Sequence, residues 1–290
     1  MSLDTVEVDW EDRAVTNTNN RSHKREKENL RLQNKSSLQT MSSSSSFKNK
    51  VIVVTGAGGN FGREGCLYFA RCGAKVVAMD NNIETLEETA AYVKKETSEE
   101  PELFIAPCDV TDVKSVEDAV NSAVARFSRI DLLWNNAGYQ GQIKPTLDYD
   151  PNDFSIVMNV NVTGMFIVLQ AVAKQMVKQQ KEAVEDTSQY SIVNTSSVAG
   201  LRGTPAMVAY ASSKAAVLAM TVSTSKDLAP YGIRVNAVSP ALIGPGFMWD
   251  RQNELHASSG SPYFATNPEI VAKNKVNSVP MKRLGTINEG

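Results

Sequence analysis

The stretch VIVVTGAGGNFGREG, residues 51–65, sets the fold because an apolar run is followed at once by a glycine-rich loop and then by a helical pattern. A strand that ends in such a loop and opens a helix presents the free N–H groups of the helix N-terminus, which favour a pyrophosphate. We therefore predict a strand, loop and helix that bind a dinucleotide. The predicted loop contacts are Gly56, Asn60, Phe61 and Gly62.

The glycine spacing of this loop departs from the common fingerprints. Phe61 stands where G-x-G-x-x-G needs its third glycine, and Asn60 takes the middle glycine when the stretch is written T-G-x-x-x-G-x-G from Thr55. Asparagine accepts a positive φ more readily than other non-glycine residues, at a cost of about 1 kcal/mol. We therefore expect Asn60 to occupy a turn meant for glycine and to place its amide near the cofactor.

An acidic residue follows the second apolar run. Asp80 stands where a carboxylate binds both ribose hydroxyls of a dinucleotide and repels a 2'-phosphate. No lysine or arginine occurs among residues 56–61, and none immediately follows Asp80, so NAD is predicted rather than NADP. In CDVTD, Asp109 and Val110 are predicted near the adenine, while a helix N-cap at Asp112 is an equally good interpretation of this acidic pair.

From Phe47 onward, short apolar runs alternate with amphipathic stretches of helical length. This alternation predicts a Rossmann-like, doubly wound α/β domain, with a parallel sheet covered on both faces. The predicted strands are 51–54, 75–79, 103–106, 131–134, 190–194 and 233–238, and the predicted helices are 61–72, 83–96, 112–128, 152–180 and 208–229. Right-handed crossovers gather the loops after the strands at one edge, where such folds bind ligands.

The composition argues against several classes of protein. The 30 lysines and arginines nearly balance 32 aspartates and glutamates, so a small-molecule partner is expected rather than nucleic acid or a membrane. Two histidines are too few for a multi-histidine centre, and no metal is predicted. Three cysteines without C-x-x-C spacing argue against a disulfide framework. We find no apolar run of roughly 18 residues and no signal-like N-terminus, so a cytoplasmic protein is expected.

The N-terminal part differs from the rest. Residues 1–46 are polar and charged, and they end in a serine run. Such a segment buries too little apolar surface to offset chain entropy, so a disordered extension is predicted. Residues 47–290 form the predicted dinucleotide-binding domain.

Four further motifs follow in order: NNAG (135–138), NVNVTG (159–164), NTSSVAG (194–200) and YASSK (210–214). Tyr210 and Lys214 are one helical turn apart and share a helix face. Ser197 stands 13 positions before the tyrosine. This set, behind a glycine-rich loop, resembles the short-chain dehydrogenase/reductase family, and the resemblance covers about residues 47–290.

The chemistry of this set can be argued from the side chains. A tyrosine acts as a base at neutral pH only if its pKa falls roughly three units from its reference near 10, which is about 4 kcal/mol. The ammonium of Lys214 and the positive ring of an oxidised nicotinamide can supply that stabilisation. Ser197 can hydrogen-bond a substrate oxygen as charge develops there. The predicted reaction has Tyr210 take the hydroxyl proton while a hydride leaves the same carbon for the nicotinamide.

The family resemblance implies further roles. Asn161 would complete a proton relay that leads from Lys214 to solvent, although Asn159 competes for this role. The family is typically a homodimer or homotetramer. The implied cofactor contacts outside the loop also include Asn136, Tyr210, Lys214 and Pro240.

The substrate side is predicted from the C-terminal region. Residues of about 241–279 would form the family's substrate lid, in which Trp249 offers apolar cover. After NNAG, Gln140 and Gln142 could bind a hydroxyl-rich substrate, although glutamines more often face solvent. NNAGYQG with GPGFMWDRQNELHA and SVPMKRLG is most similar to bacterial NAD-dependent xylitol dehydrogenases, which implies a polyol such as xylitol, oxidised to D-xylulose.

Two features depart from the family pattern. Ala241 follows Pro240, where the family often has a glycine and then a threonine that contacts the nicotinamide carboxamide. The chain ends at GTINEG, so a further helix and a seventh strand are expected to be absent and 233–238 to form an aggregation-prone edge strand. Two alternatives stay open: a 3-oxoacyl-carrier-protein-type reductase, which Asp80 disfavours, and a truncated, inactive dinucleotide-binding protein.

Overall fold

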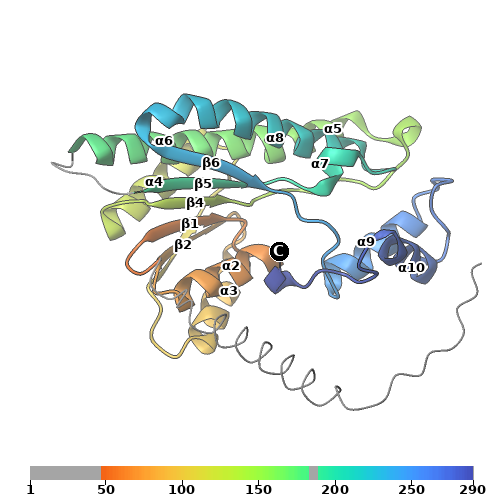
Figure 1. Cartoon of the computed structure of the whole chain (residues 1–290), viewed down its shortest axis with the longest axis horizontal. Helices are drawn as coiled ribbons and strands as arrows, with labels where there is room; N and C mark the ends of the chain where they lie inside the picture. Colours follow the sequence, from red (N-terminus) through yellow and green to blue (C-terminus); the bar gives the residue numbers. More distant parts are fainter. Residues whose placement is uncertain (1–46, 183–188, 290) are drawn as a thin grey trace, which may run out of the picture. The chain divides into compact units, whose positions relative to one another are not determined.

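The computed structural model describes residues 47–182 and 189–289, and the extension predicted for residues 1–46 lies outside them. The described residues form a six-stranded parallel sheet with the order β3-β2-β1-β4-β5-β6 (Figure 1). The strands are β1 (Val51–Thr55), β2 (Lys75–Asp80), β3 (Leu103–Pro107), β4 (Leu132–Asn135), β5 (Tyr190–Thr195) and β6 (Ile233–Val238).

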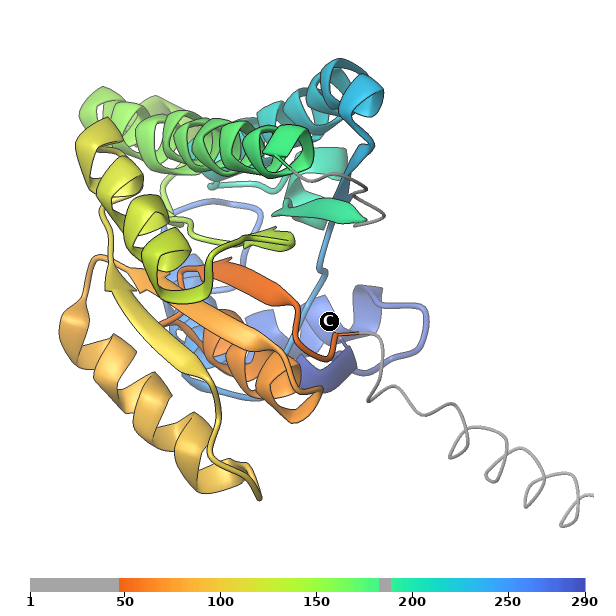
Figure 2. The same cartoon turned by 90° about the vertical axis from the view of Figure 1, so that its left-hand side faces the viewer.

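Helices connect the strands and cover both faces of the sheet (Figures 1 and 2). The long helices are α2 (Asn60–Arg71), α3 (Ile83–Glu96), α4 (Val113–Phe127), α6 (Met165–Glu182) and α8 (Val208–Leu228). The shorter ones are η1 (Thr146–Asp148), α5 (Pro151–Met158), η2 (Asn159–Gly164), α7 (Val198–Arg202), η3 (Ala229–Tyr231), α9 (Phe247–Ala257), α10 (Pro268–Ser278) and η4 (Ile287–Glu289).

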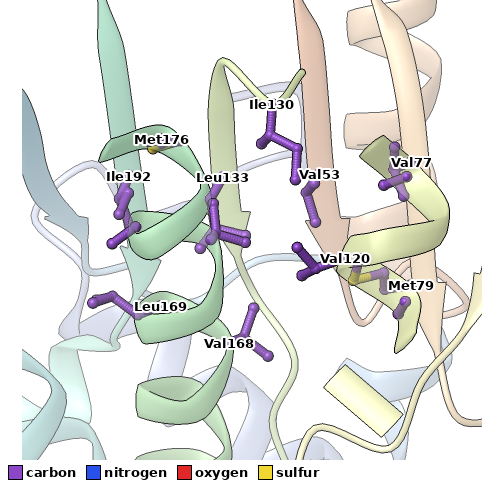
Figure 3. Packing of buried hydrophobic residues seen from close by; sticks show 14 of the residues in the cluster. Val53, Val77, Met79, Val120, Ile130, Leu133, Val168, Leu169, Met176 and Ile192 are labelled. Atoms are coloured by element: carbon purple, nitrogen blue, oxygen red, sulfur yellow. The ribbon is translucent and has the colours of Figure 1, made fainter. Parts of the chain in front are cut away.

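The apolar run of β1 serves two cores. Val51 and Val53 pack in the cluster that includes residues of α4 and α6, whereas Ile52 and Val54 pack in the cluster that includes residues of α2 and α3. Side chains of a strand alternate between faces, so a strand covered on both sides needs consecutive apolar residues. Figure 3 shows the first cluster, with Val53 beside residues of the neighbouring strands and helices.

The predicted fold is confirmed. Each predicted strand is a strand of the sheet, within one residue at either end, and each predicted helix is present. The predicted helix 152–180 is interrupted by the π-helical segment η2, which the amphipathic pattern did not reveal. This irregularity lies at the carboxyl end of the sheet, beside the residues described below.

The helical run Pro151–Glu182 is long and apolar enough to cross a membrane, with a mean hydropathy of 1.8 in its most apolar window. The expectation that no apolar run approaches this length is therefore wrong. In the protein, Val168, Leu169, Val172 and Met176 of this run are at most 3% exposed and pack in the core cluster on one face of the sheet. Packing against the sheet accounts for the apolar composition of the run.

Strand β6 lies at one edge of the sheet, as predicted, and pairs only with β5 among the described residues. A cavity of about 680 Å³ lies between α2 and the sheet and reaches β6. Its lining includes Ile52, Trp134, Val193 and Val238, and Val238 is 40% exposed. The aggregation tendency of this edge stays a prediction.

Candidate active site

The predicted motifs meet at the carboxyl ends of β1, β4 and β5, and Thr55 joins two of them. Its hydroxyl accepts hydrogen bonds from the backbone N–H groups of Asn136 (2.8 Å) and Ala137 (2.9 Å). It also donates to Asn135 Oδ1 at 3.3 Å. The glycine-rich loop after β1 and the NNAG segment after β4 are thus held side by side.

The glycine-rich loop leaves the first turn of α2 open. Helices α3, α4 and α5 are capped by the side chains of Asn82, Asp112 and Asp150, whereas Gly59 caps α2 without a side-chain hydrogen bond. A Cβ on Gly62 would lie 2.1 Å from the Gly56 carbonyl oxygen, so glycine is needed for this close approach. Free N–H groups at a helix N-terminus fit a pyrophosphate.

Asn60 does not have the conformation that we expected. It is the first residue of α2 and is not among the residues with positive φ, whereas Gly56 has a φ of +66°. The helix begins one residue earlier than predicted, which gives Asn60 helical geometry. The left-handed turn of the loop is made by a glycine, and the asparagine belongs to the open helix end.

Asp80 lies beside this loop. Its Oδ2 accepts a hydrogen bond from Gly58 N at 3.0 Å, and its Oδ1 accepts one from Asn82 N at 3.1 Å. A Cβ on Gly58 would lie 2.1 Å from the Thr85 hydroxyl, so this contact also requires glycine. The carboxylate therefore holds the glycine-rich loop. It also stands at the end of β2, where a ribose is recognised in this type of fold, and the ribose contact of Asp80 stays a prediction.

The two acids of CDVTD take different roles. Asp112 caps α4 by accepting a hydrogen bond from Lys114 N at 2.8 Å. Asp109 is exposed, and its Oδ1 accepts from the backbone and hydroxyl of Thr111. Val110 lies beside η2, since a Cβ on Gly164 would be 2.9 Å from Val110 Cγ2. The adenine contact predicted for Asp109 and Val110 stays a prediction.

Tyr210, Lys214 and Ser197 are brought together. Lys214 is 3% exposed, its Nζ donates to the Thr195 carbonyl at 2.8 Å, and it lies 5.6 Å from the centroid of the Tyr210 ring. Ser197 is the N-cap of α7, and its Oγ accepts from Ala199 N at 3.2 Å. These contacts place a phenol, an ammonium group and a hydroxyl within one small volume.

The pKa values in this group differ from the expectation. Burial raises the pKa of Tyr210, and its hydrogen bond with Ser197 acts in the opposite direction. Burial also lowers the pKa of Lys214 to about 8. The protein alone therefore does not provide the lowered tyrosine pKa that a base requires, because desolvation outweighs the neighbouring groups. A bound positive charge would have to supply the difference.

Asn161, rather than Asn159, lies beside this group. Asn159 is exposed, whereas Asn161 is fully buried in η2. The Asn161 amide accepts from Tyr139 N at 2.7 Å and donates to the Tyr139 carbonyl at 2.8 Å and to Ser213 Oγ at 2.9 Å. A Cβ on Gly138 would be 3.2 Å from Asn161 Oδ1 and 3.4 Å from Lys214 Nζ.

The three residues predicted to bind substrate differ in their surroundings. Gln140 Oε1 accepts a hydrogen bond from Gln252 Nε2 of α9 at 3.1 Å, so the loop after NNAG contacts the C-terminal region. Gln142 is exposed. Trp249 is half-buried in α9, and Lys275 Nζ lies 5.3 Å from the centroid of its indole ring. Contact of these three side chains with substrate stays a prediction.

The turn after β6 lies next to Ser197. The Pro240 carbonyl accepts a hydrogen bond from Val198 N at 3.1 Å, at the first residue of α7. Ala241, which stands near the family's glycine and threonine, offers no side-chain donor. The cofactor contact predicted for Pro240 stays a prediction.

Three positions near the site were not predicted from the sequence. Ser213 bonds Asn161, Asp153 bonds the loop after NNAG, and Gln252 bonds Gln140. An acid in the first turn of a helix is usually exposed, so the burial of Asp153 could not be predicted from the sequence. Ser213 and Gln252 act through tertiary contacts that no local pattern reports.

The pair α9 and α10 contains a buried histidine. His256 is 1% exposed, and its Nδ1 lies 2.7 Å from the Gln252 carbonyl oxygen and 3.1 Å from Lys275 Nζ. Lys275 also donates to Asn253 Oδ1 at 2.8 Å. Burial and the charge of Lys275 lower the pKa of His256 to about 4.

We expect acid to destabilise the protein through His256. Between its ordinary pKa of 6.5 and about 4, the unfolded chain binds a proton that the folded chain does not, so the free energy of unfolding falls as the pH falls through this window. The loss from this residue should be on the order of 1 kcal/mol. Urea unfolding at neutral and acidic pH should show a smaller loss for His256→Gln than for the wild type. An equal loss in both would contradict the prediction.

Comparison with known proteins agrees with this geometry. The family model "short chain dehydrogenase" matches residues 50–255. Levodione reductase of Leifsonia aquatica is 33% identical over 250 residues, which cover 86% of this chain and 87% of that protein. A 3-oxoacyl-[acyl-carrier-protein] reductase of Thermotoga maritima is 33% identical over 243 residues, which cover 84% of this chain and 87% of the relative.

A solved structure extends the comparison. The structure of a xylitol dehydrogenase with bound NAD+ has a TM-score of 0.79 and 47% sequence identity to this chain, and the match covers 84% of this chain and 90% of that chain. The extent of these matches shows the family predicted from the motifs. The chain belongs to the short-chain dehydrogenase/reductase family.

Proposed function

We propose that this member of the family is an NAD-dependent dehydrogenase that oxidises a secondary alcohol, with a polyol such as xylitol as the substrate and D-xylulose as the product. The observation that carries the proposal is the buried Lys214 beside Tyr210 and Ser197. These residues lie at the carboxyl ends of the strands, where α2 also begins. The polyol is supported by the 47% identity to a xylitol dehydrogenase.

NAD is the proposed cofactor, and the residues present fit it. The open N-terminus of α2 would bind the pyrophosphate, and Asp80 would accept hydrogen bonds from the ribose hydroxyls. Lys214 would hold the nicotinamide ribose, with Asn136 and Pro240 at the same edge of the sheet. When bound, NAD accepts a hydride from the carbinol carbon.

The side chains of this chain manage the proton. As the C–H bond breaks, the Tyr210 phenolate takes the hydroxyl proton, so that the alcohol loses one hydride and one proton and becomes a ketone. Ser197 donates a hydrogen bond to the same oxygen. The Lys214 ammonium stabilises the phenolate, and Asn161 orders the path by which the proton then leaves Tyr210 for solvent.

A second candidate is the reverse reaction on an acyl-carrier-protein substrate. A relative that is 33% identical is a 3-oxoacyl-[acyl-carrier-protein] reductase, which favours this candidate. Reductases of this type usually draw on NADPH, and the Asp80 carboxylate would repel the 2'-phosphate of that cofactor. The geometry around Asp80 therefore supports the polyol dehydrogenase more strongly.

Cofactor absorbance distinguishes the candidates. We expect NADH to form when the purified protein receives NAD with xylitol, sorbitol or a simple secondary alcohol, and the rate to be highest with a polyol. Oxidation of NADPH with an acetoacetyl thioester, without turnover of any alcohol, would favour the second candidate. NAD binding without turnover of any of these compounds would contradict both.

A further inference from the structure

The loop at residues 139–142 connects three parts of the substrate side. Its first residue, Tyr139, exchanges two backbone hydrogen bonds with the Asn161 amide, at 2.7 and 2.8 Å. Its second residue, Gln140, accepts from Gln252 of α9 at 3.1 Å. A displacement of this loop would therefore move both Asn161 and the contact with α9.

A buried carboxylate lies against this loop. Asp153 of α5 is 6% exposed, and its Oδ2 accepts hydrogen bonds from Gln142 N at 2.9 Å and from Tyr149 Oη at 2.6 Å. Its Oδ1 accepts from Tyr139 Oη at 3.3 Å. Burying a carboxylate is costly unless donors compensate it, and here three donors converge on one side chain.

The loop is shaped to approach this carboxylate. Gly141 has a φ of +71°, and a Cβ on it would lie 2.8 Å from Asp153 Oδ2, 2.7 Å from Tyr149 Oη and 2.5 Å from Val157 Cγ2. Glycine adopts this conformation without strain, and its missing side chain leaves room for the contact. Burial and the nearby Asp153 raise the pKa of both Tyr139 and Tyr149, so both phenols remain protonated donors at neutral pH.

We propose that Asp153 is a positioning residue for the alcohol substrate: it fixes the loop 139–142 and thereby sets the places of Asn161 and Gln140. This proposal rests on the dehydrogenase function proposed above. Loop 139–142 contacts Asn161, Asp153 and Gln252, whereas the glycine-rich loop after β1 contacts Asp80 and Thr85. Loss of Asp153 should therefore impair use of the alcohol more than binding of NAD.

Asparagine at position 153 can keep all three contacts of Asp153, so Asp153→Asn is a conservative variant. Two donors bond Oδ2 and one bonds Oδ1, so an asparagine with its carbonyl in place of Oδ2 keeps the bonds from Gln142 N and Tyr149 Oη. Its amide nitrogen can donate to the Tyr139 hydroxyl, which also accepts. Asp153→Asn should keep the loop in place, whereas Asp153→Ala removes both acceptor oxygens and with them all three hydrogen bonds.

Asp150 offers a matched control on the same helix. It caps α5 by accepting from Asn152 N at 2.8 Å and, within the described part of the chain, makes no hydrogen bond with the loop. Asp150→Ala therefore removes an acid and weakens α5 without releasing the loop. Its effect on activity measures what general destabilisation of α5 contributes.

Steady-state kinetics of the full-length chain with NAD and xylitol test the proposal. We expect Asp153→Ala to lower kcat/KM for xylitol by about 10- to 100-fold, mainly through KM, with the Kd of NAD within about twofold of wild type. Asp153→Asn should recover most of this loss, and Asp150→Ala should keep the wild-type KM. Wild-type kinetics in Asp153→Ala, an equal loss of NAD affinity, or no recovery in Asp153→Asn would overturn the proposal.

Hydrogen exchange of the peptide that spans the loop gives a readout without turnover. Asp153→Ala should speed exchange at Gln142 N, while Asp153→Asn and Asp150→Ala should leave it slow. Equal protection in all variants would overturn the positioning role. If the wild-type protein oxidises no alcohol, the proposed function fails, but the exchange measurement still decides whether Asp153 fixes the loop.

Discussion

Replacement of Tyr210 by phenylalanine is expected to lower kcat by about 10²- to 10⁴-fold, the range that a positioned acid or base contributes. The substitution removes one oxygen and leaves the ring that lies beside Lys214. NAD affinity should fall far less than kcat, because the ring stays in place and the lost oxygen acts mainly on the alcohol proton. Initial rates of NADH formation with xylitol and calorimetric titration with NAD measure the two quantities.

A control is available in a second tyrosine. Tyr231, at the end of η3, is 41% exposed, and Tyr231→Phe makes the same chemical change away from the site. It should keep wild-type kinetics. If Tyr210→Phe retained more than about a tenth of the wild-type kcat, the tyrosine would not be the base and the proposed proton route would be wrong.

For Tyr210, the sequence predicted the position of the side chain but not its pKa. Its place beside Lys214 was predictable because a four-residue spacing on a helix brings two side chains to one face. Its pKa was not, because the shift depends on burial among elements that are distant in sequence. The raised pKa implies that the tyrosine becomes a useful base only when the oxidised cofactor adds its positive charge.

The fold was predictable for a related reason. In β1, four consecutive apolar residues face two different cores, and this pattern requires helices on both sides of the sheet. Asn60 shows the opposite case. The helix was predicted to begin at residue 61 but begins at Asn60, so this residue is helical and not in the predicted turn. Helix ends depend on capping contacts, and a loop without a capping side chain offered no signal for the boundary.

The residues that support the site were the hardest to predict. Asp153 and Ser213 act through hydrogen bonds to a loop and to an amide that lie 11 or more positions away in the sequence. Their spacing matches no helical or strand period, so no local pattern identifies their partners. The residues proposed for chemistry, by contrast, lie at ends of strands or on one helix face, where periodicity places them.

Asp80 has two roles that a pair of substitutions can separate. It accepts a hydrogen bond from Gly58 N in the glycine-rich loop, and its charge is proposed to select NAD over NADP. Asp80→Ala removes the acceptor and the charge together. Asp80→Asn keeps an acceptor for Gly58 N but removes the charge, so a difference between the two variants measures the contribution of the loop contact.

We expect Asp80→Ala to raise the Kd of NAD by about 10- to 100-fold, because hydrogen bonds to a charged group contribute roughly 1.5–3 kcal/mol. Both variants should gain activity with NADP, since the repulsion of the 2'-phosphate is lost. Asp80→Asn should lose less NAD affinity than Asp80→Ala, because its loop stays in place. The ratio of kcat/KM for NAD to that for NADP measures the change in cofactor preference. If both variants kept the wild-type ratio, the carboxylate would serve the loop alone, and cofactor selection would have to come from the surface around Arg63, which pairs with Glu88 at 2.9 Å.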